Sequence, residues 1–491
     1  MKRIVIRDGT IIPPFGEPAR DLRILNKPLW LLQRELLTRH CRGTMEVDSI
    51  SEIPPDREEL LVYRDNLYFN QDLVDTFIAE AKKLGRACQI AFSNTDLAIK
   101  KHALPLQEGI RKHTSEDVYI ADLFYFPNGI EESPRPLVID TLGREMGYYH
   151  IPSYMAEKGD LVFYVPMRPF LSIENWVHVF MANSPFGVFS WGRIQEQHVE
   201  DSWREKLAVS LATMKDRLNP LAPRWRNHFL ASSRMVKIGK NCSIDPTATI
   251  HGPTVIGNNV TIGAGVVITN SLIGNNVTIM QGSQVMLSVV SDRCYLPFNG
   301  GLFMTTLMDN SMVAQLTCLQ MCVVGRNTFI GAGNIFTDFN LLEPTNREED
   351  NEIQTYHKGK LVSVGLPVLG SAVGHNCKIG SGFVVYPGRL IGANTTLIYG
   401  EPSTAIMHNV NEYPNDVPEV GTNEFGEPNP TVYVWPRRFD PQTRTYYDKK
   451  SKPAASAPQP EAAESAPPAT DEQLEMSVPT PAHVGHRRIY R

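Results

Sequence analysis

An apolar side chain recurs every six residues through the middle of the chain, and this spacing is the strongest constraint on its fold. The first of these positions are Ile238, Ile244, Ile250, Ile256, Ile262 and Ile268. A small or β-branched residue mostly stands two positions before each, and Gly or Asn tends to follow. A period of six is neither helical nor the alternation of a single strand. Each hexad therefore predicts one short strand and one turn with Gly or Asn at positive φ, and the stacked hexads predict a left-handed parallel β-helix.

The hexad pattern continues, with interruptions, over residues 236–400, which are the limits of the predicted β-helix. Its phase slips by one near Ile273 and resumes at Ile279, Val285, Val324, Ile330, Phe336, Val373, Ile379, Val385, Ile391 and Leu397. We expect one break at about 297–319 and a second, acidic and polar, at about 341–361. A long excursion from a regular solenoid is often a functional loop, and a solvated insertion is the alternative that the sequence leaves open.

Residues 1–193 have a different pattern, in which apolar strand-like runs alternate with helical ones. Runs such as 3–6, 60–63 and 161–165 read as strands, whereas LWLLQRELL and QDLVDTFIAEAKKL have helical periodicity. The alternation predicts an α/β domain, Rossmann-like, with a mostly parallel sheet. We expect a helical connector over residues 194–235, an extension over 401–450, and a Pro/Ala/Glu/Ser-rich disordered tail over 451–491.

Composition excludes several classes of function for the chain as a whole. The net charge of -5 and pI near 6.2 give no electrostatic basis for binding nucleic acid. The apolar run at the start of the chain is too short for a signal peptide or a membrane span, so we expect a cytoplasmic protein without membrane insertion. The seven cysteines are scattered without a C-x-x-C, which suggests neither a zinc site nor a disulfide framework.

Three stretches of the first domain carry a resemblance to a known family: PARDLRILNKPL, LVYRDNLYFNQDL and RPFLSIENWVHVFMAN. Together with the hexads, they resemble the sugar-1-phosphate nucleotidyltransferases with C-terminal hexapeptide repeats, especially the bifunctional uridyltransferase/acetyltransferases. The resemblance implies a nucleotidyltransferase-like α/β domain and a homotrimer. It also implies a nucleotide triphosphate or nucleotide sugar and a sugar phosphate as partners. Mg²⁺ would be held by Asp65 and Asn183, with Arg20 and Lys27 contacting the nucleotide or sugar.

The chain departs from the family's pattern at several catalytic positions. Its first loop reads DGTIIPPFGEP where the family has a Gly-rich phosphate loop, and two prolines remove donors and flexibility. Ala19 replaces a phosphate-binding lysine unless Arg20 compensates, and Ser172 replaces a metal-binding aspartate of some members. The catalytic motifs are therefore degenerate, and we expect Mg²⁺-dependent binding to exceed turnover.

The segment VAQLTCLQMCVVGRNTFIGAG resembles the family's acetyltransferase site, which would use acetyl-CoA and the residues Gly331, Ala332 and Gly333. It places Gln315 where the family has a catalytic histidine, and an amide is not basic enough to deprotonate an amine. His357 in the second excursion is the best substitute candidate for that base. His375 and His251 are expected to be exposed corner residues.

Three hypotheses about function follow from these patterns. The first is a transferase-family protein that acts on or binds nucleotide sugars. The second is a noncatalytic trimeric scaffold or sugar-nucleotide sensor. The third is an acyl-CoA-dependent acyltransferase on the β-helix.

Overall fold

The computed structural model describes residues 1–447 except 56, 150, 152–159, 219–232, 340–352, 400–404, 407–408, 411–430, 436–437 and 441–444. The predicted disordered tail at 451–491 and most of the predicted extension lie outside the described residues. Among the described helices, none is long and apolar enough to cross a membrane.

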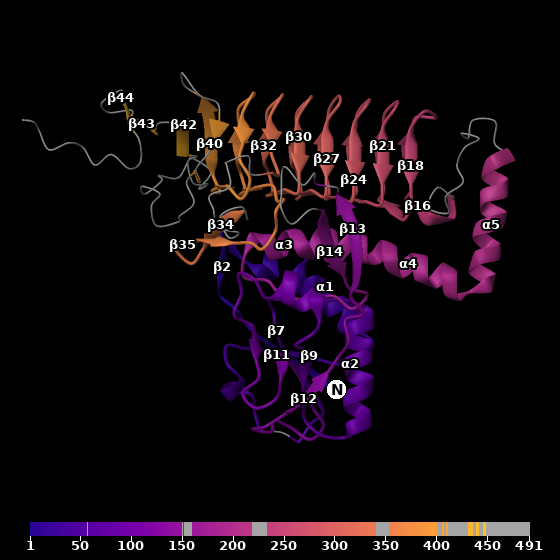
Figure 1. Cartoon of the computed structure of the whole chain (residues 1–491), viewed down its shortest axis with the longest axis vertical. Helices are drawn as coiled ribbons and strands as arrows, with labels where there is room; N and C mark the ends of the chain where they lie inside the picture. The colour runs from indigo at the N-terminus through magenta and orange to yellow at the C-terminus, as the bar shows by residue number, and fades with distance from the viewer. Residues whose placement is uncertain are drawn as a thin grey trace, which may run out of the picture. The chain divides into compact units, whose positions relative to one another are not determined.

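Three stacked parallel sheets make up the second half of the described chain, and with the hexad spacing they fit a left-handed parallel β-helix (Figure 1). The first sheet contains β16 (Val236–Ile238), β19 (Thr254–Ile256), β22 (Leu272–Ile273), β25 (Val289–Val290), β28 (Thr306–Leu307), β31 (Val323–Val324), β36 (Ala372–Val373) and β39 (Leu390–Ile391). The second contains β17 (Ser243–Ile244), β20 (Thr261–Ile262), β23 (Thr278–Ile279), β26 (Tyr295–Leu296), β29 (Met312–Val313), β32 (Phe329–Ile330), β37 (Lys378–Ile379), β40 (Thr395–Tyr399) and β42 (Thr431–Trp435). The third contains β18 (Thr249–His251), β21 (Val267–Thr269), β24 (Gln284–Met286), β27 (Gly301–Phe303), β30 (Cys318–Gln320), β33 (Ile335–Phe336), β38 (Val384–Val385) and β41 (Ala405–Ile406). The β-helix begins at Val236, as the hexads predict, and its strands continue past residue 400.

The expected break at 297–319 does not exist. Strands β26 to β30 continue the three sheets through this segment, with Leu302, Leu307 and Val313 buried in the β-helix core. The second excursion does exist, between β33 and β36, and it contains a hairpin of β34 (Gln354–His357) and β35 (Lys360–Ser363).

One corner of the β-helix loses a residue, which explains the slip of phase. Val236 pairs with Thr254, 18 residues on, whereas Val255 pairs with Leu272, and the next coils keep this 17-residue step. The shortened corner lies between the third and first sheets. The residues at this corner with positive φ are Asn270, Leu287, Met304 and Met321. We call the corner formed by these four residues the docking corner.

The N-terminal sheet has the order β12-β9-β11-β7-β1-β6, with β10 paired to β11. Its strands are β1 (Lys2–Ile6), β6 (Thr44–Val47), β7 (Leu60–Arg64), β9 (Cys88–Ser93), β10 (Ile110–Lys112), β11 (Val118–Phe126) and β12 (Arg135–Val138). β11 is antiparallel to β7, β9 and β10, and the pairs β1/β6, β1/β7 and β9/β12 are parallel. Three of these six pairings are antiparallel, so the sheet is mixed, and the Rossmann-like assignment of this domain stays a prediction.

The two predicted helices are α1 (Leu29–Leu37) and α2 (Gln71–Leu84). Asn70 caps α2 by accepting from the Leu73 N–H at 3.0 Å, and Gly85 ends it at a φ of 63°. Both helices bury their apolar faces in one cluster with Leu61 and Tyr63 of β7. Ile4 and Val62 belong to a smaller cluster that does not include these helices.

Smaller pairs of strands and further helices complete the description. The pairs are β2 (Ile11–Ile12) with β3 (Glu17–Pro18), β4 (Arg23–Ile24) with β5 (Lys27–Pro28), β8 (Leu67–Phe69) with β15 (Phe170–Ser172), β13 (Arg144–Tyr149) with β14 (Leu161–Val165), and β43 (Arg438–Asp440) with β44 (Thr445–Tyr447). The run 161–165 is thus a hairpin strand outside the main sheet. Within the predicted connector, α4 (Ser190–Asp201) begins before residue 194 and α5 (Trp203–Leu218) follows it.

The β-helix and the α/β domain share one apolar core. Helix α3 (Trp176–Asn183) is buried along its whole length and contacts β31. Leu287, Met304 and Met321 of the docking corner belong to the same cluster as Trp176 and Phe180 of α3. A left-handed φ costs a branched or bulky residue roughly 1–2 kcal/mol, and burying such a side chain returns roughly 1.5–3 kcal/mol. Burial against the α/β domain therefore offsets the backbone cost at this corner.

We expect Met304→Asn to destabilise the protein by about 2–5 kcal/mol, because it removes a buried side chain although Asn suits the left-handed φ better. The matched control is Arg293→Asn, at an exposed corner with a φ of 58°. There the change should stay within about 0.5 kcal/mol or stabilise slightly. Urea unfolding of both variants measures the difference, and equal effects would show that the docking corner is not held by burial.

Candidate functional site

In the α/β domain, the order in which the strands are connected favours ligand binding at the carboxyl ends of β1 and β7. After β1 the chain crosses through α1 to β6 on one side, and after β7 it passes through α2 to β9 on the other. Ligands of open α/β sheets bind at such a switch point, outside the carboxyl ends of the strands. Asp8 follows β1 and Asp65 follows β7, so both carboxyl groups stand at this edge.

Asp65 is buried here and bonded through both carboxylate oxygens. The Asp8 N–H donates to its Oδ1 at 2.8 Å, and Nη1 of Arg20 lies 3.0 Å from its Oδ2. The guanidinium of Arg20 also reaches Glu46, with 3.4 Å between Nη1 and Oε2 and between Nη2 and Oε1. The structure therefore brings together two of the predicted residues, Asp65 and Arg20, and adds Glu46, which the sequence analysis missed.

The ion pairs extend into a network along the same edge. Arg7 donates to Glu46 at 3.0 Å, and Arg64 donates to Asp122 at 2.6 Å while lying 4.0 Å from Asp8. Arg111 donates to Asp122 at 2.9 Å. The members are four carboxylates and four guanidiniums, which we call the arginine network: Asp8, Glu46, Asp65, Asp122, Arg7, Arg20, Arg64 and Arg111.

Burial and pairing act in opposite directions on the acids of this network. Burial raises the pKa of Asp65 to about 6, although the Asp8 N–H and Arg20 oppose the shift. The pKa of Glu46 is lowered, chiefly by its hydrogen bond from Arg20. Glu46 is accordingly the firmer anionic partner of Arg20 at neutral pH.

A second polar chain lies beside the network. Asn66 donates to Ser172 at 3.3 Å, and Ser172 donates to Glu174 at 2.7 Å. Glu174 in turn accepts from the N–H groups of Glu108 and Gly109 at 2.9 and 2.8 Å. The Oδ1 of Asn66 is buried without a hydrogen-bond partner among the described residues, so a ligand donor or a water can satisfy it.

Asn183 and Lys27 do not join this site. The Oδ1 of Asn183 accepts from the Leu25 N–H at 2.8 Å, and its Nδ2 donates to the carbonyls of Arg23 and Val179. Lys27 pairs with Glu35 on α1. No group of three or more His, Cys, Asp or Glu that could hold a metal occurs among the described residues. The side chain of Asn183 is used in bonds to backbone groups, and Asp65 is paired with Arg20, so these two residues do not suit Mg²⁺. The assignment of Mg²⁺ to this pair stays a prediction.

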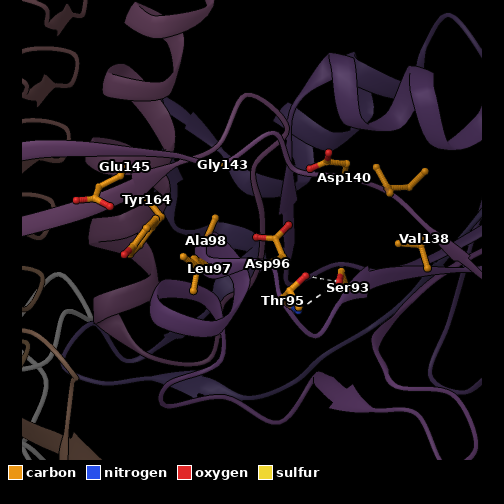
Figure 2. Close-up of a pocket in the computed structure, with 11 residues that line it drawn as sticks. Ser93, Thr95, Asp96, Leu97, Ala98, Val138, Asp140, Gly143, Glu145 and Tyr164 are labelled. Atoms are coloured by element: carbon orange, nitrogen blue, oxygen red, sulfur yellow. Dashed lines mark hydrogen bonds between the residues drawn. The ribbon is translucent and has the colours of Figure 1, made fainter.

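A cavity of about 530 Å³ opens at the same edge of the sheet, beyond the ends of β9 and β12 (Figure 2). Ser93 ends β9, Thr95 and Asp96 stand in the loop after it, and Asp140 follows β12. Asp96 accepts from the Thr141 hydroxyl at 2.6 Å, which fixes one loop against the other. Glu145 and Tyr164 of the β13/β14 hairpin also line the cavity, and Leu97, Ala98, Val138 and Ile139 add apolar surface. Among the described residues the lining contains no Lys, Arg or His.

The residues predicted for the β-helix site stack at the corner between the second and third sheets, which we call the free corner. The Gly333 N–H donates to the Gln315 carbonyl at 3.0 Å, and the Ala332 N–H donates to Ser381 at 3.1 Å. A Cβ on Gly331 would lie 2.7 Å from the Gly380 carbonyl, so glycine is required there for stacking. Gln315 is exposed.

His357 lies in a different environment from Gln315. It stands on β34, where its Nδ1 is 3.3 Å from the Nδ2 of Asn175. The same hairpin binds the α/β domain through Trp176, which donates to Thr355 at 2.9 Å, and through Lys358, which pairs with Glu108 at 2.7 Å. The described part of the excursion is therefore packed against the α/β domain and is not a solvated insertion.

The expectation that His375 is an exposed corner residue is wrong. Its Nδ1 accepts from the Arg326 N–H at 2.8 Å, so its proton is on Nε2, which faces Glu17 at 3.0 Å. Arg326 also pairs with Glu17, and the Pro14 carbonyl accepts from the Ala393 N–H at 3.0 Å. His375 is buried because this corner of the β-helix is covered by the first loop of the α/β domain. His251 is half-buried.

Residues 235–270 match the family described as bacterial transferase hexapeptide (six repeats). This match covers the first coils of the β-helix, where the six-residue spacing is unbroken. No curated protein matches the chain. The match supports a transferase-type or scaffold role and carries no information about the α/β domain.

We expect Glu17→Gln to destabilise the protein by about 1–3 kcal/mol at pH 7, because it removes the charge that accepts from His375 and Arg326. Burial would raise the pKa of Glu17, but these bonds outweigh it and hold the pKa below its ordinary 4.5. A depressed carboxyl pKa stabilises the fold above the unfolded value and loses that contribution as pH falls through the folded one. The stability difference from wild type should therefore persist down to the ordinary value of 4.5 and shrink as the pH falls below it, in thermal unfolding scans. A difference that does not depend on pH would contradict the ionic character of this contact.

Proposed function

We propose that this protein binds a sugar phosphate or nucleotide sugar at the carboxyl edge of its α/β sheet and assembles as a homotrimer through its β-helix. The observation that carries the proposal is the arginine network at the switch point between β1 and β7. Planar guanidinium groups match the oxygens of phosphates better than any other side chain. A network of four arginines at a ligand-binding edge is therefore suited to the anionic part of such a ligand.

The neighbouring cavity suits the uncharged part of the same ligand. Its hydroxyls and carboxylates, from Ser93, Thr95, Asp96 and Asp140, can exchange hydrogen bonds with sugar hydroxyls. Its three carboxylates disfavour a phosphate there, since no described lining residue is a cation that would offset them. The phosphate would accordingly lie at the arginine network and the sugar in the cavity.

Binding is favoured over turnover by the same residues. The first loop carries Pro13 and Pro14 and is bonded to the β-helix through Pro14 and Glu17. Such a loop offers few N–H groups to the charge that develops in phosphoryl transfer. Acyl transfer on the β-helix is disfavoured because Gln315 is not a base and His357 contacts the α/β domain.

We expect at least one of UDP-N-acetylglucosamine, GDP-mannose and glucose 1-phosphate to raise the melting temperature, since a ligand that binds the folded state stabilises it. Arg20→Ala should weaken that binding by roughly tenfold or more, because hydrogen bonds to a charged group contribute about 1.5–3 kcal/mol. Lys27→Ala, which removes a cation outside the site, is the control and should leave binding unchanged. A panel that produces no shift in the wild type would leave the scaffold hypothesis in place of ligand binding.

The proposed trimer is supported by apolar side chains around the free corner. Leu316 is 65% exposed, and Phe298, Phe329 and Ile335 are 40–49% exposed. The Leu316 N–H donates to the Phe298 carbonyl at 3.2 Å, and Phe329 pairs with Met312, so these residues stand on successive coils. The first sheet packs against the α/β domain, whereas this patch is exposed at another corner and can contact another copy. Helix α5 carries a second set of exposed apolar side chains: Trp203, Leu207, Leu211 and Met214.

We expect Leu316→Asp to convert the trimer to a monomer, because a buried unpaired carboxylate would be costly at the interface. Leu361→Asp is the control, since Leu361 is 56% exposed on the β34/β35 hairpin, away from the free corner. Light scattering at micromolar concentration reports both masses. A wild-type monomer, or a Leu316→Asp trimer, would count against this interface.

A further inference from the structure

We propose that Arg20 takes the place of a divalent cation at Asp65, so that the site holds its anionic ligand without a metal. The choice of ligand rests on the proposed function, but the statement about the cation concerns residues of this chain alone. It differs from what the resemblance to nucleotidyltransferases implies, which is Mg²⁺ at Asp65.

The first argument is the position of the guanidinium. Arg20 bridges two carboxylates that belong to different strand ends, at 3.0 Å from Asp65 and 3.4 Å from Glu46. A metal ion would occupy this place, because it too would have to contact the Asp65 carboxylate from the ligand side. To bind there it would have to displace Arg20 and leave a guanidinium without its buried partner, which is unfavourable.

The second argument is the balance of charge around Asp65. Each carboxylate of the arginine network has a guanidinium within 4.0 Å, so the charge of every acid in this network is offset. Mg²⁺ requires an octahedron of oxygen ligands at about 2.0–2.1 Å. Asn183, the second predicted ligand, already uses its amide oxygen on the Leu25 N–H.

The third argument is that the β-helix holds Arg20 in place. Arg20 lies between two anchored residues: Glu17 pairs with Arg326 and His375, and the Asp21 carbonyl accepts from Arg326 at 3.4 Å. Two residues further along, Arg23 donates to Asp309 of the β-helix at 2.6 Å. The segment that carries Arg20 is therefore fixed from both sides and cannot easily swing away to admit a metal.

Arg20 still has donors for a ligand in this arrangement. A guanidinium offers five N–H donors, and the bonds to Asp65 and Glu46 number three. The remaining N–H donors of Arg20, together with Arg64 beside Asp8, can contact a phosphate in the way that a bound metal ion would.

The test measures Mn²⁺ binding by electron paramagnetic resonance on the full-length protein, with no organic ligand present. We expect wild type and Asp65→Asn to bind Mn²⁺ equally weakly, because Asp65 is not a metal ligand. Arg20→Gln removes the built-in cation and should bind Mn²⁺ at least about tenfold more tightly, since a unit charge within about 4 Å of the site opposes a second cation strongly. The double variant Arg20→Gln/Asp65→Asn should lose this gain.

Two further variants control for charge and for folding. Arg20→Lys keeps a cation and should behave as wild type. Lys27→Gln removes a cation that lies outside the site and pairs with Glu35, and it should also behave as wild type. Mn²⁺ binding by wild type that disappears in Asp65→Asn would overturn the proposal, and this comparison decides it even if Arg20→Gln does not fold. Because no nucleotide is used, failure of the proposed ligand to bind leaves this result unaffected.

Discussion

The packing of the docking corner against α3 is the interaction on which the other contacts of this molecule depend. Leu287, Met304 and Met321 stand in a backbone conformation that isolated residues of their type avoid, and their burial in the shared core makes that conformation favourable. The first sheet of the β-helix is thereby held against the α/β domain. Once the two surfaces are in register, Arg326 and His375 meet Glu17, and Arg23 meets Asp309.

This dependence links the β-helix to the chemistry of the α/β edge. The loop after β1 is short of glycine, and its position is set by partners that lie more than 300 residues away in sequence, such as Arg326. A loop fixed in this way gains order and loses the freedom to wrap around a substrate. The β-helix thus acts as a rigid support for the binding edge, in addition to any role in assembly.

The β-helix could be predicted from sequence because its signal is local and repeated. Helices at 29–37 and 71–84 were predicted for the same reason, since each has a complete apolar face. The coils at 297–319 were missed because their inward residues, Leu302, Leu307 and Val313, follow one another at five and six residues, so the corner that drops a residue disturbs the period.

The site could be predicted only in part. Asp65 and Arg20 belong to stretches that resemble a family motif, so the sequence alone pointed to them. The partners Glu46, Arg326 and His375 became visible only when the fold brought them near. His375 in particular looks like any other corner residue of a hexad, because a repeat does not reveal which of its three corners another domain covers. The repeat therefore predicts which residues lie inside the β-helix, but not which of its corners contact another domain.

The contact between the docking corner and the α/β domain limits where the β-helix can change in length. Asn270, Leu287, Met304 and Met321 recur at the coil period, so the surface offered to the α/β domain is a ladder with a fixed rung spacing. A residue inserted at one of these four corners would change the turn that contacts the α/β domain, whereas the coils that begin at Val236 and Ala372 have 18 residues and belong to the same three sheets. Whole coils, in contrast, can be added before Asn270, where the first coil still has 18 residues, without altering any rung. The coils that carry the docking corner are therefore fixed in length by their contact with the α/β domain, whereas the coils before them are not.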